Sequence, residues 1–538
     1  MEPLRLLVWA CLTAAGTPAA TTPAPALVIN LGSYHRPISS KSKKAQAYFD
    51  QGLRLLYAFN HEEAQAAFEE AARLDPSCAI CFWGAALTLG PNINLPALPE
   101  RAEAAWVLLG KARAATASAS PVERALISAL AKRYTHPPPT DPEKQRALDT
   151  GYADAMRKVA KRFPKDADVL TLFAEAMMDT RPWDFWTADG RPQPGTKEIV
   201  ATLKEVLQAD PDHPGANHYL IHAVEASPHP EQALAAAERL KTLEPGAGHL
   251  VHMPSHVYFR TGSYAESSEA NRQAIAVDAA VAHNHPIYGM YIAHNFQFLW
   301  ASTLMEGRSA ESLRAARDLL QRAPPEMLKE MPGVDYLLAY PVVGLARFGR
   351  WKELLAEPLP AADFPTALGL VHAARGLARL RTGDRAGAAL ELAELEAIRK
   401  RLAPDAKVMM NSAGDVLGIA VDVLGAELAR GDGDLATAFI RFERAIAAED
   451  ALHYDEPPDW EFPVRHQYGA ALLAAGRPQK AEAVYREDLA RHPHNGWALY
   501  GLAQSLRAQS KTAEASEVQR AFEEAWKRAD VQLTASAF

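Results

Sequence analysis

The chain is short of cysteine and of long apolar stretches. Three of its 538 residues are cysteine, and no second C-x-x-C pair accompanies Cys78 and Cys81, so a four-cysteine zinc centre is excluded. Beyond the N-terminal segment no eighteen consecutive apolar residues occur, so we expect no transmembrane segment in the mature chain. Sustained alternation of β-branched residues is also missing, and this absence predicts an all-α protein.

A strong charge imbalance and the common catalytic signatures are also absent. The net charge of −8 is mild for this length, and lysine and arginine do not cluster with aromatic residues, so nucleic acid is not an expected partner. The sequence holds no G-x-S-x-G, H-E-x-x-H or G-x-x-x-x-G-K-[ST] motif and no EF-hand loop. Whether the chain is an enzyme must therefore be argued from individual side chains.

Residues 1–26 have the form of a secretory signal peptide. An apolar stretch from Leu6 to Ala15 is followed by small residues with A-x-A cleavage sites. The stretch is too short to span a bilayer stably, so we expect export to the periplasm or secretion. Only ten residues precede Cys11, which is short for a lipoprotein signal, and lipid anchoring there is not expected. Residues 27–44 form an N-terminal extension.

A hairpin-sized pattern of small and aromatic residues recurs along the chain. The whole chain is longer than one compact core usually supports, so we expect either several domains or a solenoid. Between Ala45 and Pro76, small residues let two antiparallel helices approach closely, and the proline ends the second helix. The pattern there consists of Tyr48, Gly52, Ala64, Phe68, Ala71 and Pro76. Similar units recur around turn glycines at Gly262, Gly307, Gly349, Gly383, Gly431 and Gly476.

From residue 45 onward the chain resembles a secreted bacterial tetratricopeptide-repeat (TPR) protein. The resemblance implies a TPR-like α-solenoid of about a dozen helical hairpins, whose concave groove holds a peptide or protein partner. Inserted loops are expected at residues 283–293, 400–415 and 452–461. The expected domains are an N-terminal array at residues 45–281, which includes the histidine-rich repeats, and a C-terminal array at residues 282–538.

Histidine is concentrated in one part of the chain. Nine of the eighteen histidines lie between His218 and His294. Four of them form two i, i+4 pairs, His218 with His222 and His252 with His256, and the pairs lie 34 residues apart. This spacing is the period of a TPR. Stacked repeats place equivalent positions of neighbouring helices side by side, so the four imidazoles are expected to converge.

The histidine pattern predicts a metal site on the concave face. Residues at i and i+4 lie about 5 to 6 Å apart between Cβ atoms, close enough for two imidazoles to bind one ion. The resemblance also places His249 and His294 on the groove. Copper or zinc suits a nitrogen-rich site, whereas iron would more often take a carboxylate, which Glu225 could supply. Pro254, inside the second histidine helix, should bend it, and such local exceptions tend to mark functional sites.

These residues are compatible with several functions. The leading hypothesis is an exported TPR scaffold that binds a peptide or protein and has a histidine-lined metal site. One alternative is a metalloenzyme with one coordination position left open for water or substrate. Another is a protein that sequesters copper or zinc. Without a metal, the same histidines would contact a bound peptide or form structural hydrogen bonds.

Two further segments carry residues of interest. Cys78 and Cys81 stand at the start of an expected helix, where an exported protein would form a local disulfide. Packed reduced cysteines, a redox pair or half of a metal site would have the same spacing. Before the histidine pairs, an inserted loop carries Trp183, Phe185 and Trp186. These aromatics either cap the groove or fill a gap in helix packing.

Overall fold

The computed structural model describes residues 25–28, 30–281 and 286–538. In this part of the chain nearly all regular structure is α-helix, and its strands are the two-residue β1 (Lys407–Val408) and β2 (Asn411–Ser412). The all-α prediction is therefore confirmed. Cys11 and all but the last two residues of the predicted signal peptide lie outside the described residues, as do His283 and His285.

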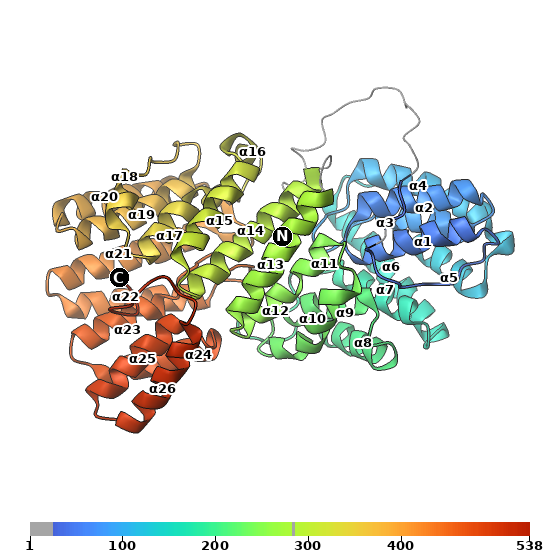
Figure 1. Cartoon of the computed structure of the whole chain (residues 1–538). Coiled ribbons are helices and arrows are strands. Elements are labelled where there is room, and N and C mark those ends of the chain that lie inside the picture. Colours follow the sequence, from blue (N-terminus) through green and yellow to red (C-terminus); the bar gives the residue numbers. More distant parts are fainter. Residues whose placement is uncertain (1–24, 29, 282–285) are drawn as a thin grey trace. The chain divides into compact units, whose positions relative to one another are not determined.

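The chain divides into two compact units of consecutive helices (Figure 1). Among the described residues, the N-terminal unit comprises 25–257 and 276–281, and the C-terminal unit comprises 258–275 and 286–538. The repeat pattern predicts a boundary after residue 281. The two compact units meet between Val257 and Tyr258, within a helix, and the division of the repeats into two arrays stays a prediction.

In the N-terminal unit, most helices pack on the next helix along the chain. Helix α1 also packs against α9, which is far from it in sequence. The helices are α1 (Lys43–Tyr57), α2 (His61–Leu74), α3 (Ala79–Thr88), α4 (Pro99–Ala114), α5 (Pro121–Leu130), α6 (Pro142–Arg162), α7 (Ala167–Met178), α8 (Thr196–Ala209), α9 (Pro214–Val224), α10 (Leu234–Leu243) and α11 (Gly248–His252), with 3₁₀ turns η2 (Thr116–Ser118) and η3 (Pro230–Ala233). Helices α12 (Pro254–Arg260) and α13 (Tyr264–Val281) each contribute residues to both units.

Small residues set the helix spacing in the first repeat. A Cβ atom at Gly52 or Gly84 would lie only 2.7 or 2.6 Å from the ring of Phe68. Glycine at both positions therefore allows α1 and α3 to close on that ring from α2. The oxygen of Ser42 caps the start of α1 by accepting from the amide of Ala45. This is the close approach that the small residues of the first hairpin predict.

The C-terminal unit repeats this construction. A Cβ atom at Gly469 or Gly501 would lie 2.3 or 2.2 Å from the ring of Tyr485. The helices are α14 (Pro286–Met305), α15 (Ser309–Arg322), α16 (Pro325–Lys329), α17 (Tyr340–Arg347), α18 (Trp351–Ala356), α19 (Pro365–Arg381), α20 (Arg385–Arg401), α21 (Ala413–Gly431), α22 (Leu435–Asp450), α23 (Val464–Ala474), α24 (Pro478–Arg491), α25 (Gly496–Ala508) and α26 (Thr512–Ala525), with a 3₁₀ turn η4 (Asp335–Ala339).

Two of the three expected insertions are irregular segments between helices. The antiparallel pair β1 and β2 lies between α20 and α21, and residues 451–463 connect α22 to α23. The loop expected at residues 283–293 is wrong over its described part, because α14 begins at Pro286. Proline suits the first turn of a helix, because its missing N–H would have no partner there, and the apolar residues that follow continue the helix to Met305.

Most hairpin turns contain a glycine with a left-handed backbone. Values of φ between 66° and 89° occur at Gly262, Gly307, Gly349, Gly383 and Gly476. Gly431, the expected turn residue of another hairpin, instead ends α21, and Gly433 takes the left-handed conformation. In the first hairpin the same position, two residues beyond the helix, is taken by Phe59 with φ of 58°. A bulky side chain in this conformation is uncommon.

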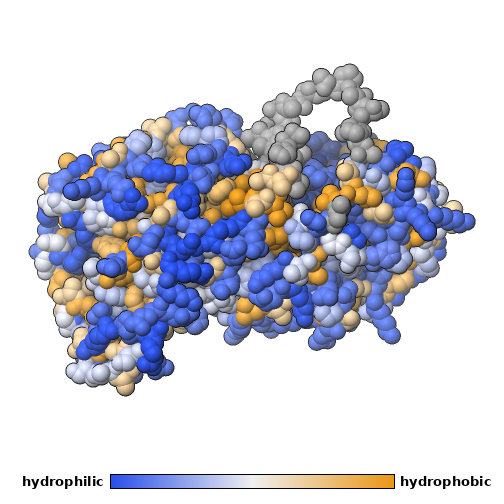
Figure 2. All heavy atoms as spheres, viewed as in Figure 1, coloured by the Kyte–Doolittle hydropathy of each residue, from blue (hydrophilic) through white to orange (hydrophobic). Residues whose placement is uncertain are grey.

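The helices bury their apolar faces within each unit. In the C-terminal core, Trp300 stacks on Tyr340 with ring centroids 3.8 Å apart. Figure 2 shows a mostly hydrophilic surface with scattered apolar patches on the visible face. Within the described ranges, no helix combines the length and the apolar character needed to cross a membrane.

Candidate metal centre

Five histidines of the N-terminal unit lie close together on neighbouring helices. His218 and His222 are one turn apart on α9, His249 and His252 lie on α11, and His256 follows on α12. As Pro254 predicts, the second histidine helix is interrupted: α11 ends at His252 and α12 begins at the proline. The break separates the last two histidines onto different helices.

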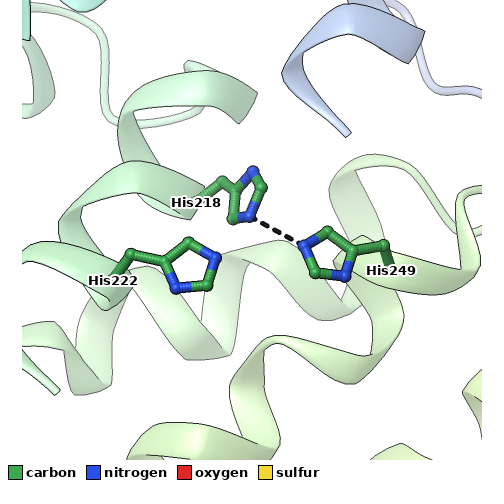
Figure 3. A group of neighbouring side chains, drawn as sticks. All are labelled: His218, His222 and His249. Carbon is green, nitrogen blue, oxygen red and sulfur yellow. Dashed lines mark hydrogen bonds between the residues drawn. The ribbon is translucent and has the colours of Figure 1, made fainter. Parts of the chain in front are cut away.

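His218, His222 and His249 form a triad whose rings turn toward one another (Figure 3). One ligand nitrogen from each ring lies within 4.8 Å of the other two. Nε2 of His218 and Nε2 of His249 are 3.1 Å apart. Two nitrogens bound to one zinc ion at about 2.0–2.1 Å, with an angle of about 90° to 109° between the bonds, lie about 2.9–3.4 Å apart. His218 and His249 therefore have the spacing of two ligands of a single ion, and His222 lies within reach of the same point.

Hydrogen bonds on the far side of two rings direct their lone pairs into the triad. Nδ1 of His218 lies 2.6 Å from the carbonyl oxygen of Tyr57. Because a carbonyl only accepts, Nδ1 carries the proton, and the neutral ring presents a lone pair at Nε2. Nδ1 of His222 lies 2.9 Å from Oε1 of Glu225, which orients that ring in the same way. Carbonyl and carboxylate acceptors of this kind accompany metal-binding histidines.

The triad is buried and favours neutral imidazoles. His218, His222 and His249 are 0%, 1% and 5% exposed. Burial lowers the pKa of His218 well below its ordinary value, and the neighbouring His222 lowers it further. Burial also lowers the pKa of His249 well below its ordinary value, with added repulsion from His218. Neutral imidazole is the form that binds a metal ion.

A second set of two imidazoles, the couple His252 and His256, lies beside the triad. Their Nε2 atoms are 2.6 Å apart, and Nδ1 of His256 lies 2.5 Å from Oε2 of Glu225. Oγ of Ser255 lies 3.4 Å from Nδ1 of His252. Glu225 therefore contacts one ring of the triad, His222, and one ring of the couple, His256.

Two aromatic residues with strained backbones cover the triad. The ring of Phe59 lies between 4.6 and 6.0 Å from all three triad rings, measured between centroids. Trp183 meets His222 edge-on at 5.2 Å. Their φ angles are 58° and 63°, and such a conformation costs on the order of 1–3 kcal/mol for each residue with a side chain. This strain persists only where the surrounding structure enforces it, and it gathers at functional sites.

Packing of α1 on α9 brings Tyr57 and Phe59 to the triad. Gly215, at the start of α9, permits this contact, because a Cβ atom there would lie 2.4 Å from the Tyr57 ring. The Tyr57 hydroxyl donates to Oδ1 of Asp168 at 2.5 Å, and Arg36 of the N-terminal extension binds Oδ2 of the same carboxylate at 2.6 Å. The extension, the first hairpin and the histidine helix are thus tied together.

The structure groups the predicted ligands differently from the expected four-histidine patch. His218, His222 and His249 lie within ligand reach of one another, and His252 pairs with His256 beside them. Glu225 lies behind His222 and His256, bonded to their Nδ1 atoms. It therefore orients ligands in this arrangement.

All five histidines are buried, and Phe59 and Trp183 contact rings of the triad. Their place on a concave groove stays a prediction. His294, which was expected on the same groove, lies on α14 in the C-terminal unit, with Nδ1 3.4 Å from Oε1 of Gln297.

The cysteines and the aromatic loop are also placed by the structure. Cys78 and Cys81 are joined in a buried disulfide at the start of α3. In the loop, Trp183 covers the triad, whereas Phe185 is buried and Trp186 donates from Nε1 to the carbonyl of Ala223 at 2.8 Å. The loop therefore both covers the histidines and fills a packing gap.

Sequence reasoning missed Tyr57 and Phe59. The contribution of Tyr57 is a backbone carbonyl, which every residue has, so no residue type could have revealed it. Phe59 did leave a signal, because it stands at the turn position that glycine takes in most other hairpins. A bulky residue at a glycine position indicates a side chain that is needed there.

Comparison with known proteins agrees with the repeat architecture. Residues 43–78 match the family model of the tetratricopeptide repeat, and no curated protein matches the chain significantly. Among solved structures, a human IFIT1 dimer with m7Gppp-AAAA is similar at 12% identity, over 83% of this chain and 90% of that chain, with a TM-score of 0.35. The APC/C hetero-tetramer Cut9-Hcn1 is similar at 10% identity, over 91% and 80%, with a TM-score of 0.37. At these scores neither likeness bears on function.

Proposed function

We propose that the chain is a tetratricopeptide-repeat scaffold that binds a peptide or protein, and that it also holds a transition-metal ion on His218, His222 and His249. One observation carries this proposal. Three buried imidazoles turn ligand nitrogens toward a common point, and two of them are oriented from behind by the Tyr57 carbonyl and the Glu225 carboxylate.

Copper or zinc is the ion that these donors suit best. The triad offers three nitrogens and no carboxylate oxygen, and imidazole is a good ligand for both metals. Glu225 uses its oxygens to accept from His222 and His256. Iron is the alternative, because one ligand atom each from His222, Glu225 and His256 also lie within 4.8 Å of one another.

Export and partner binding complete the proposal. The signal-like N-terminus supports export, and a disulfide between Cys78 and Cys81 is compatible with an oxidising compartment. Repeated helical hairpins support a groove that receives a peptide or protein segment. Because the triad is buried, the metal and the partner are proposed to occupy different places.

Metal analysis of purified protein tests the proposal. We expect wild-type protein dialysed against copper or zinc to retain at least one ion per chain, measured by mass spectrometry. The double variant His218→Ala, His249→Ala should retain one ion fewer per chain than wild type. The control is His136→Ala, His229→Ala, which removes two exposed histidines of the same unit and should retain as many as wild type. Wild-type protein that retains no ion would refute the metal site.

A metalloenzyme is the second candidate, because three protein ligands leave one position open on a four-coordinate ion. Phe59 and Trp183 would keep bulk water from that position. The test is addition of azide to the copper-loaded protein. A new charge-transfer band would show an exchangeable position, as an enzyme needs, whereas an unchanged spectrum would favour sequestration.

A further inference from the structure

We propose that the couple His252 and His256 binds a second transition-metal ion beside the first, so that the centre is dinuclear. This inference rests on the proposed function, in which the first ion is bound by the triad. It adds a separate site with its own ligands. The argument starts from the hydrogen bonds of the couple.

The couple has the same construction as His218 and His249. In both, Nε2 of one ring faces Nε2 of the other, at 3.1 Å in the triad and 2.6 Å in the couple. The two rings of the couple must move apart by about 0.3 Å to reach the spacing of two ligands of one zinc ion. In both, one ring is oriented through Nδ1 by a buried acceptor. That acceptor is the Tyr57 carbonyl for His218 and the Glu225 carboxylate for His256.

The tautomers explain why an ion suits the couple. Glu225 accepts from Nδ1 of His256, so the neutral ring of His256 has its lone pair at Nε2. That lone pair faces Nε2 of His252, which must carry a proton if the two nitrogens are to share a hydrogen bond. A metal ion can take the place of this proton and bind both lone pairs. When the ring of His252 starts as the Nε2–H tautomer, binding moves its proton to Nδ1, where Oγ of Ser255 lies 3.4 Å away, and the ring stays neutral.

The two sets are adjacent and share one negative charge. Ring centroids of His222 and His256 are 5.7 Å apart, and those of His249 and His252 are 6.0 Å apart. Two cations this close in a buried region repel each other strongly. The carboxylate of Glu225 bonds to one ring of each set and thereby reduces this repulsion. Glu225 would therefore stabilise a centre that holds two cations.

Geometry predicts the order of binding. Nε2 of His218 and Nε2 of His249 already have the spacing of two ligands of one ion, whereas those of the couple must first move apart, so the second ion should fill after the first. Imidazole donors favour copper or zinc for both positions.

Stoichiometry at saturating metal tests the inference. We expect two ions per chain in wild type, one in His252→Ala, His256→Ala, and two in the exposed control His136→Ala, His229→Ala. Circular dichroism checks that each variant is folded. One ion in wild type that remains in the His252→Ala, His256→Ala variant would overturn the dinuclear centre but leave the proposed function intact. No ion in wild type would refute both.

A measurement without substitutions guards against misfolded variants. Wild-type protein is titrated with copper(II) and followed by electron paramagnetic resonance. Adjacent ions should broaden or quench the signal once the first equivalent has bound. A signal that grows with the second equivalent and keeps the shape of an isolated ion would contradict the inference. Growth that stops after one equivalent would also contradict it.

Discussion

The carbonyl of Tyr57 accepts a hydrogen bond from Nδ1 of His218, a residue 161 positions further along the chain. Tyr57 is the last residue of α1, and the final carbonyls of a helix have no partner within it. The end of the first repeat helix is therefore completed by a histidine of the triad. In return, the carbonyl fixes which nitrogen of that histidine faces the triad.

Substitution of Gly215 should disturb the hydrogen bond between Tyr57 and His218, although Gly215 takes no part in it. The Cβ atom of alanine would lie 2.4 Å from the Tyr57 ring, so α1 must shift away from α9. We expect Gly215→Ala to lower the free energy of unfolding by about 1–3 kcal/mol and to weaken metal binding, as measured by urea unfolding and chelator competition. The control Gly110→Ala has no atom within 4 Å of the new Cβ and should stabilise its helix by about 1 kcal/mol. Equal effects at the two glycines would contradict the prediction.

Loss of Glu225 should weaken the metal centre without removing a proposed ligand. Glu225→Ala leaves Nδ1 of His222 and Nδ1 of His256 without their carboxylate. Removal of such an orienting acceptor typically costs about 10–100-fold in metal affinity, which competition with a chromogenic chelator can measure. Glu231→Ala is the matched control. The side chain of Glu231 is exposed and, like that of Glu225, contacts a histidine, in this case the exposed His229. An affinity as high in Glu225→Ala as in Glu231→Ala would show that Glu225 does not orient the ligands.

At Phe59, glycine should be tolerated better than alanine. Both substitutions remove a buried ring, at a cost of about 3–5 kcal/mol for alanine. Glycine also relieves the backbone strain at φ of 58°, so Phe59→Gly should be more stable than Phe59→Ala by about 1 kcal/mol. Phe68, inside α2, should show the opposite order, because glycine disfavours a helix by about 1 kcal/mol relative to alanine. Urea unfolding of the four variants gives the comparison, and the same order at both sites would count against strain at Phe59.

Metal-free protein should lose stability as the pH falls. The pKa of His218 and that of His249 lie well below their ordinary value in the folded state, whereas the unfolded chain protonates them near pH 6.5. The unfolded state therefore binds more protons below that pH, and each histidine removes up to about 1.4 kcal/mol per pH unit. This contribution is fully present above pH 6.5 and is lost as the pH falls toward the folded pKa.

The difference between wild type and a variant isolates this effect. Burial raises the pKa of Glu449 and that of Glu461 to about 8, and these carboxyl groups act in the opposite direction. We therefore compare urea unfolding at pH 7.5 and 5.5 for wild type and for His218→Gln, His249→Gln, with a chelator present. Between pH 7.5 and pH 5.5, the free energy of unfolding should fall more in wild type than in the variant. Equal losses would show that the two histidines are not held neutral.

Part of the centre could be predicted from the sequence because it depends on local spacing. Histidines four residues apart share one face of a helix, so the proximity of His218 to His222 follows directly from the chain. Pro254 likewise predicts the break between α11 and α12, because it lacks the backbone N–H of a continuing helix. The carboxylate of Glu225 stands three residues after His222 and reaches its ring by the same helical geometry.

Pairing across repeats could not be predicted in the same way. The repeat period correctly brings the two histidine segments near each other, yet it favours equivalent positions as partners. In the structure the equivalent residues His222 and His256 are linked through Glu225. His218, however, faces His249 and not its equivalent His252. A shift of one helical turn changes which rings meet, and such a shift depends on the break at Pro254 and on packing that spacing along the chain does not encode.

The sequence by itself determined the helices, their hairpins and the concentration of histidine in one segment, because apolar periodicity, small residues and turn residues act over a few positions. Only the tertiary structure decided that the histidines are buried, which of them face each other, and that Tyr57 and Phe59 belong to the centre. The physical reason is distance along the chain. The contact of α1 with α9 joins segments far apart in sequence, and it depends on how all the intervening helices pack.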